Sequence, residues 1–153
     1  FVTEPLAGFP QPVPMTVDFG TGVYLHSESG GFLIGKADRD EAPGFNETVD
    51  WGFLERVAEL ATSRVPALEN ARVKTAWAGM YEVTPDNHPI IGPAGEPGWW
   101  TACGYSGHGV MHAPATGQIL AALIAGRQAP LDVSCLRLSR FREGKAIVET
   151  NVI

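Results

Sequence analysis

The residues best suited to chemistry in this sequence lie in a glycine-rich loop in the second half of the chain. The apolar run Trp99 to Cys103 is followed by glycines at positions 104, 107 and 109, and then by an Ala/Leu/Ile-rich segment. Strand, glycine-rich turn and helix in this order expose backbone N–H groups at the positive end of a helix dipole. Because glycine lacks a Cβ, a planar or anionic ligand can approach such a backbone closely. The pattern therefore predicts a ligand-binding loop, with a plain strand-to-helix connection as the alternative.

Two histidines in this region, His108 and His112, are four residues apart and raise the alternative of a zinc site. The helical metalloprotease motif requires a Glu directly after the first His, and Gly109 stands there. Pro114 also disfavours a regular helix across both histidines. We therefore expect no metal, and we interpret His108 as a loop residue near a ligand or bonded to the backbone.

Other candidate side chains are fewer. Tyr81 ends a predicted strand and is either a core aromatic residue or a hydroxyl that faces a ligand. Asp86 is most simply a turn former. No Ser-His-Asp order and no paired acid/base carboxylates stand out, so hydrolysis has little support. A basic tail is expected to be solvated, and it consists of Arg137, Arg140, Arg142 and Lys145.

The elements that position these residues follow from local pattern. Strands are predicted at residues 15–18, 23–26 and 31–35, with hairpin loops between them, which favours an antiparallel meander. Asp50 is a good N-cap, and Pro66 ends the helix that follows. Its apolar residues recur at helical spacing, and they are Phe53, Leu54, Val57, Leu60 and Ala61.

The second half is predicted to contain strands at residues 72–81 and 88–92, with a turn at residues 84–87 between them. Regular helix is expected to begin near Pro114, because proline is tolerated in the first turn. That leaves Ser106 to His112 as a turn with outward-facing N–H groups. Gly126 is predicted to end the helix, and residues 136–141 to form a last irregular strand.

Length, charge and composition exclude several classes of function. The 153 residues suit one ordinary domain, and the net charge of −6 argues against a nucleic-acid partner. No apolar run approaches the ~18 residues of a membrane span, and no signal peptide is evident. Cys103 and Cys135 have no metal-like spacing, and the cytoplasm is the default location. The start at Phe1, which reads as the end of a strand, suggests a fragment, a processed chain or a deliberately shortened one.

Three motifs occur in order over residues 77–141, and they are WAGMYEVTPDNHPIIGP, ACGYSGHGVMHAPATGQILAALI and PLDVSCLRLSRF. They resemble the C-terminal region of FAD-dependent amine and amino-acid oxidoreductases of the D-amino-acid oxidase-like superfamily. Glycine oxidase, sarcosine oxidase and the β subunit of L-proline dehydrogenase belong to this group. The earlier segment PVPMTVDFGTGVYLHSESGGFLIG is similar to the substrate-domain meander of the same family.

The resemblance implies an α+β fold. Residues 1–83 would be part of the substrate-binding domain, with an antiparallel sheet and a packed helix. Residues 84–153 would be the C-terminal part of the FAD-binding domain, completed by a strand, a loop and a helix. The N-terminal FAD-binding segment, with its glycine fingerprint, is absent from this chain and would be its partner. The isolated chain is then expected to be inactive.

The resemblance also implies the chemistry: oxidation of a secondary amine or amino acid by hydride transfer to FAD. Tyr81 and His108 would be catalytic, and the substrate would lie under the sheet that carries Tyr81. The residues that would bind the flavin are Gly104, Tyr105, Ser106, Gly107, His108, Gly109, Val110 and Met111. Preorganised N–H donors there would stabilise the negative charge of reduced flavin.

The chain departs from monomeric sarcosine oxidases at two positions. Those enzymes carry a flavin-linked cysteine where Gly79 stands and a substrate-binding lysine where Met111 stands. FAD is therefore expected to be non-covalent at the Gly79 position, and the substrate stays open. A non-catalytic binding module with the same fold is the alternative function.

Overall fold

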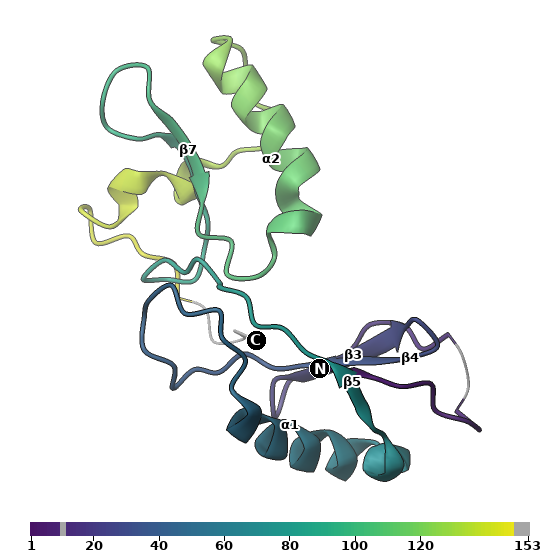
Figure 1. Ribbon diagram of the computed structural model, residues 1–153. Helices are drawn as coiled ribbons and strands as arrows, with labels where there is room; N and C mark the ends of the chain where they lie inside the picture. The colour runs from purple at the N-terminus through teal and green to yellow at the C-terminus, as the bar shows by residue number, and fades with distance from the viewer. Residues whose placement is uncertain (10–11, 149–153) are drawn as a thin grey trace. The chain divides into compact units, whose positions relative to one another are not determined.

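The computed structural model describes residues 1–9 and 12–148, and these residues divide into two compact units. The first unit runs from Phe1 to Met80, and the second begins at Tyr81 (Figure 1). The domain boundary expected from the sequence lay between residues 83 and 84. Part of the expected second domain, residues 149–153, lies outside the described residues. The chain combines sheets and helices, and each unit is described separately below.

The first unit is built on a five-stranded antiparallel sheet in the order β2-β3-β4-β1-β5. Its strands are β1 (Val2–Thr3), β2 (Thr16–Asp18), β3 (Val23–Glu28), β4 (Gly31–Gly35) and β5 (Val73–Thr75). The predicted meander is confirmed as β2, β3 and β4. The β3–β4 turn is tighter than expected: Ser29 and Gly30 alone connect the strands, with φ of 50° and 82°. Two positive φ values suit the twist of a two-residue hairpin.

Helix α1 (Trp51–Arg64) covers one face of this sheet (Figure 1). Asp50 caps it as predicted, because its Oδ1 accepts the N–H of Gly52 at 2.8 Å. The helix ends before Pro66, where the 3₁₀ helix η1 (Pro66–Asn70) begins. The sheet and these helices share one hydrophobic core, formed by Val23, Leu25, Phe32, Ile34, Val57, Ala61 and Leu68.

The strand predicted at residues 72–81 is wrong in length, because β5 ends at Thr75. Its partner β1 consists of Val2 and Thr3 alone, so the ladder has no further strand to bond. Trp77 and Tyr81 are 60% and 48% exposed, so neither is a buried core aromatic residue. Tyr81 therefore lies at the start of the second unit rather than at the tip of a strand.

The second unit contains an antiparallel ribbon, a long helix and two short 3₁₀ helices. These are β6 (Ile90–Pro93), β7 (Trp100–Cys103), α2 (Gly109–Ile124), η2 (Ser134–Leu136) and η3 (Leu138–Arg140). Ile91 of β6 and Ile119 of α2 are both buried. The irregular strand predicted at residues 136–141 is wrong: the N–H groups of Leu136 and Arg140 bond to carbonyls three residues earlier, which is the 3₁₀ pattern.

Helix α2 begins earlier than predicted, at Gly109, and contains Pro114 in its second turn. Proline lacks the N–H that would bond to the carbonyl of Val110, but Val110 is 94% exposed, so water can take that place. The predicted end is confirmed. Gly126 has a φ of 64°, and the N–H of Arg127 bonds to the carbonyl of Ala122 at 2.8 Å.

Within the described part of the chain, no helix is both long and apolar enough to cross a membrane.

Candidate functional site

The glycine loop, residues 104–111, leaves β7 and enters α2 within the second unit. Gly104 has a φ of 75°, and the methyl group of Thr84 occupies the place that a Cβ would need. A side chain at this position would therefore meet both backbone strain and a steric clash. This glycine lets the chain turn directly after the strand and lie against the segment that contains Thr84.

Ser106 is the most constrained residue of the loop. It has a φ of 52°, although it is not glycine, and it is 4% exposed. Its N–H donates to the carbonyl of Glu82 at 3.1 Å, and its hydroxyl donates to the carbonyl of Asn87 at 3.3 Å. A left-handed residue persists only where its surroundings hold it, and these two bonds do so.

Gly107 brings the loop against Tyr81. Its φ is 89°, and a Cβ there would lie 2.7 Å from the Tyr81 ring. Residues 81–88, which we call the platform, thus contact the loop through Tyr81, Glu82, Thr84 and Asn87. Two predicted site residues, Tyr81 and Gly107, are thereby brought together.

The start of α2 presents unpaired backbone donors. The first N–H groups of a helix have no partner within the helix. Among the described residues, no hydrogen bond is made by the N–H of Gly107, Gly109, Val110 or Met111 outside regular helix bonding. No acidic residue lies in the first turn, and no side chain caps it. The positive end of the helix dipole is therefore not neutralised locally.

Three of the amides expected to be outward-facing are bonded within the chain instead. The N–H of Ser106 is used by Glu82, and the N–H of His108 donates to the carbonyl of Tyr105 at 2.9 Å. His112, expected in the turn, is helical, and its N–H bonds to the carbonyl of His108 at 3.3 Å. The available donors thus begin at Gly107 and continue from Gly109 to Met111.

The remaining predicted residues flank these donors. The rings of His108 and His112 are 6.3 Å apart, tilted by 46°. The Tyr105 hydroxyl donates to Thr116 Oγ1 at 3.0 Å, which anchors the loop to the helix body. Met111 is 68% exposed, so its side chain is free to contact a ligand. In the described residues, no three His, Cys, Asp or Glu side chains are placed to share a metal ion.

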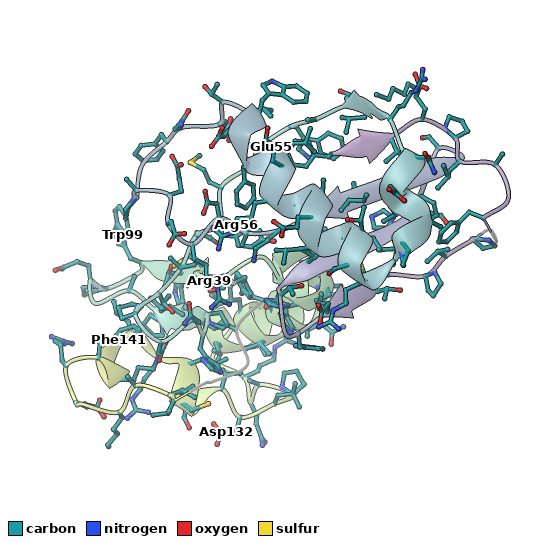
Figure 2. The ribbon with its side chains drawn as sticks, turned by 90° about the horizontal axis from the view of Figure 1, so that it is seen from below. Arg39, Glu55, Arg56, Trp99, Asp132 and Phe141 are labelled. Carbon is teal, nitrogen blue, oxygen red and sulfur yellow. The ribbon has the colours of Figure 1, made fainter. Side chains whose placement is uncertain are left out.

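Asp86 of the platform forms a buried ion pair with Arg140 that the sequence pattern does not predict. Arg140, expected to be solvated, has no exposed surface, and Asp86 is 6% exposed. The guanidinium donates to both Asp86 oxygens, from Nε and Nη2, each at 2.8 Å. The Phe141 ring, labelled in Figure 2, lies 4.2 Å from the guanidinium carbon.

Arg140 strongly stabilises the charged form of Asp86. Its hydrogen bonds hold the pKa of the Asp86 carboxyl well below the ordinary value; burial opposes them, and the N–H groups of Ile147 and His88 add to them. The partners are 54 positions apart, so no local spacing signals the pair. The sequence offers only one indication of the pair: opposite charges, Asp86 and Arg140, occur in the first and the last of the three motifs.

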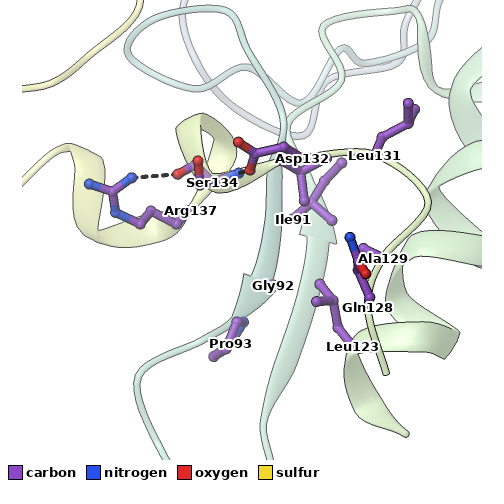
Figure 3. Close-up of a pocket in the computed structure, with 11 residues that line it drawn as sticks. Ile91, Gly92, Pro93, Leu123, Gln128, Ala129, Leu131, Asp132, Ser134 and Arg137 are labelled. Carbon is purple, nitrogen blue, oxygen red and sulfur yellow. Dashed lines mark hydrogen bonds between the residues drawn. The ribbon is translucent and has the colours of Figure 1, made fainter. Parts of the chain in front are cut away.

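A hollow in this unit lies near the C-terminal end of α2, away from the glycine loop (Figure 3). It has a volume of about 420 Å³ and is lined largely by apolar residues, among them Ile91, Pro93, Leu123 and Leu131. Its charged side chains bond to their neighbours: Asp132 accepts the N–H of Ser134, and Arg137 donates to the carbonyl of Ser134. It is a weaker candidate than the loop, because these groups are already used.

Residues 1–123 match the model of the family described as FAD dependent oxidoreductase. The chain belongs to this family. It is 36% identical to FAD-dependent oxidoreductase domain-containing protein 1 of Xenopus laevis over 149 residues, which covers 92% of this chain and 30% of that protein. It is 31% identical to sarcosine oxidase subunit beta of Rhizobium meliloti over 151 residues, which covers 97% of this chain and 35% of that protein.

Among solved structures, the crystal structure of L-proline dehydrogenase from P. horikoshii matches with a TM-score of 0.82 and 35% identity. The match covers 94% of this chain and 38% of that chain. This member of the FAD-dependent oxidoreductase family thus spans about a third of the length of the relatives that it matches. The resemblance to the D-amino-acid oxidase-like superfamily is confirmed.

Proposed function

We propose that the glycine loop binds the isoalloxazine ring of FAD in the longer protein of which this chain is a part. The row of available N–H donors at Gly107, Gly109, Val110 and Met111 is the observation that carries this proposal. A flat, electron-rich ring suits this row of donors, because Val110 is 94% exposed and no acidic side chain lies in the first turn of α2. Donors fixed before the reaction stabilise developing negative charge without reorganisation.

The proposed reaction is the oxidation of a secondary amine or an amino acid. When bound, FAD supplies the acceptor for a hydride from the carbon next to the nitrogen. The chain's own part is to orient the ring and to favour its reduced, negatively charged form through the α2 dipole. Tyr81 and His108 are the proposed substrate-side residues, since Tyr81 is half exposed beside Gly107 and His108 lies directly before the first residue of α2.

FAD is proposed to be non-covalent at Gly79, which has no side chain to form a bond and lies in open space, since a Cβ there would meet no atom within 4 Å. The functional division follows the resemblance: residues 1–83 serve the substrate domain and 84–153 the FAD domain. Cys103 and Cys135 are free thiols, which supports a reducing compartment such as the cytoplasm.

The N-terminal FAD-binding segment is the proposed partner of α2. This helix of 16 residues buries only Thr116 and Ile119 among its side chains. Ala113, Gly117 and Ala121 recur every four residues and are all exposed. Small residues at this spacing allow another backbone to approach closely. A helix this apolar on the surface is expected to be covered in the whole protein.

The test uses the protein as its gene encodes it, purified and loaded with FAD. We expect flavin absorbance on the protein, release of all FAD by acid precipitation, and bleaching under anaerobic conditions by sarcosine, glycine or L-proline. FAD that stays with the acid precipitate would contradict non-covalent binding. FAD binding without bleaching by any secondary amine or amino acid would favour the non-catalytic module. No FAD binding would overturn the proposal.

A further inference from the structure

The Asp86 carboxylate connects the platform to the C-terminal part of the second unit. Besides the two bonds from Arg140, it accepts the Thr84 hydroxyl at 3.0 Å, the N–H of His88 at 3.2 Å and the N–H of Ile147 at 3.0 Å. These five donors come from three separate stretches of the chain. The carboxylate therefore fixes the turn of the platform from inside.

Arg140 holds the same turn through bonds to the backbone as well as to Asp86. Its Nη2 also donates to the carbonyl of His88 at 2.8 Å, and its Nη1 donates to the carbonyl of Leu136 at 2.9 Å. One guanidinium thus joins Asp86, the backbone of the platform and η2. Its planar, forked donor set can serve all of these acceptors at once, which an ammonium group cannot do.

The platform in turn holds the glycine loop in its left-handed conformation. Glu82 and Asn87 accept the two hydrogen bonds of Ser106, and they flank Thr84 and Asp86 in sequence. A shift of the platform turn would move both acceptors. Loss of either ion-pair partner would leave a buried charge alone, and such a charge forces a local rearrangement.

We propose that Asp86 and Arg140 are positioning residues for the flavin site, acting through the platform on the glycine loop. The effect on the flavin rests on the proposed function. The effect on the conformation of the glycine loop does not. Neither residue touches the loop donors at Gly107 and Gly109 to Met111. Their effect is to hold Ser106, and thereby to aim the donors that follow it.

The first test measures hydrogen exchange of the Ser106 amide in the whole protein without added FAD. We expect Arg140→Met to exchange this amide at least tenfold faster, while the β3–β4 amides in the first unit stay protected. The matched control is Arg137→Met, which removes a neighbouring arginine whose bonds go to Ser134, Ser139 and Glu143 instead. Unchanged exchange of the Ser106 amide in folded Arg140→Met would overturn the proposal.

If Arg140→Met does not fold, the test uses Arg140→Lys, which keeps the positive charge. A lysine can neutralise Asp86 but cannot also bond the His88 and Leu136 carbonyls. We expect the Ser106 amide to exchange faster than in the wild type in this variant too, but more slowly than a fully unprotected amide. Protection equal to that of the wild type would show that charge alone suffices and would overturn the positioning role.

The second test measures the flavin reduction potential of Arg140→Lys in the FAD-loaded protein. Less well-aimed donors favour the reduced flavin less, so we expect a lower potential. A tenfold loss of preference for the reduced form corresponds to about 30 mV for a two-electron couple. An unchanged potential beside faster Ser106 exchange would refute the link to the flavin. If the wild type binds no FAD, the proposed function fails, while the exchange test still decides the positioning of the loop.

Discussion

Asp86 and Arg140 form a buried ion pair on which the stability of the second unit is expected to depend. Both are buried, and their charges are satisfied by each other, by nearby backbone groups and by the Thr84 hydroxyl. Breaking such a pair typically costs about 3–5 kcal/mol, because the remaining charge stays buried. We expect Arg140→Met to lower the free energy of unfolding by about that amount, measured by urea denaturation.

An exposed pair provides the comparison for this prediction. Arg56 and Asp40 lie 3.2 Å apart with side chains 57% and 81% exposed, and such pairs contribute about 0–1 kcal/mol. Arg56→Met should therefore leave unfolding almost unchanged. A double variant, Arg140→Met with Asp86→Leu, should recover part of the loss, since no lone charge remains. Equal losses for Arg140→Met and Arg56→Met would contradict the assignment.

The same pair predicts how stability depends on acid. Arg140 depresses the pKa of Asp86 in the folded chain, so folding favours the charged carboxylate. Its contribution is fully present above the unfolded value of about 4 and is lost as pH falls toward the folded value. We expect the free energy of unfolding to decrease from about pH 5 downward, with a flatter dependence in Asp86→Asn. Denaturant titrations at a series of pH values measure this.

Glu143 needs a separate control in that experiment, because Arg137 lowers its pKa to about 2. This carboxylate is about a third exposed, and solvent weakens its effect on stability. Glu143→Gln should therefore change the acid dependence less than Asp86→Asn does. The reverse order would mean that the surface pair, rather than the buried one, controls acid unfolding.

The start of α2 makes a prediction in which stability and cofactor binding move in opposite directions. Val110 is 94% exposed and lies in the first turn. In Val110→Asp, a carboxylate near the helix N-terminus should stabilise the fold by about 0.3–1 kcal/mol. The same charge should repel an electron-rich ring, so FAD affinity and reduction potential should both fall. Melting temperature, FAD titration and potentiometry are the measurements.

Val110→Asn is the neutral control of similar size for this prediction, and it should change FAD binding less. If Val110→Asp bound FAD as tightly as the wild type, the ring would not lie at this helix end. Lower stability in Val110→Asp would instead contradict the open dipole that we describe at the start of α2.

Element boundaries show what the sequence could predict. Asp50 and Pro66 predicted both ends of α1, because capping and proline chemistry are local. Gly126 did the same for the end of α2. Pro114 predicted too late a start for α2, because the N–H that proline lacks would bond a carbonyl in the exposed first turn, and its loss destabilises the helix little. The predicted strand at residues 72–81 was too long, since its length is set by β1, which is far away in sequence.

The site was predictable to the extent that it is made of backbone. Glycine spacing identified the loop, and left-handed φ values at Gly104 and Gly107 agree with that use of glycine. The side chains beneath the loop were not predictable. Arg140 is one of several basic residues near the C-terminal end, and only the folded chain brings it to Asp86.

The chain spans about a third of the length of its relatives. The exposed face of α2 leads to a prediction about the FAD-binding segment that we propose to pack on it. A Cβ at Gly117 would meet no atom within 4 Å. Gly117→Leu should stabilise α2 by about 0.5–1 kcal/mol through helix propensity if this face stays open. If the nucleotide-binding segment packs there, the variant should instead purify with less FAD. The FAD-to-protein absorbance ratio distinguishes the two outcomes.

Gly117→Ala is the matched control, because it improves helix propensity and adds little bulk. We expect it to retain FAD. Full FAD content in Gly117→Leu would contradict the proposed packing on α2, without affecting the assignment of the glycine loop.

The ion pair between Asp86 and Arg140 also has a consequence for the order of events in biosynthesis. The glycine loop leaves the ribosome well before Arg140 and Ile147, which complete the shell around Asp86. Until those later residues are synthesised, Asp86 lacks its counter-charge, and the turn that supports Ser106 lacks the bonds from Arg140 and Ile147. Capture of the cofactor is therefore expected to follow translation of this tail rather than to accompany emergence of the loop.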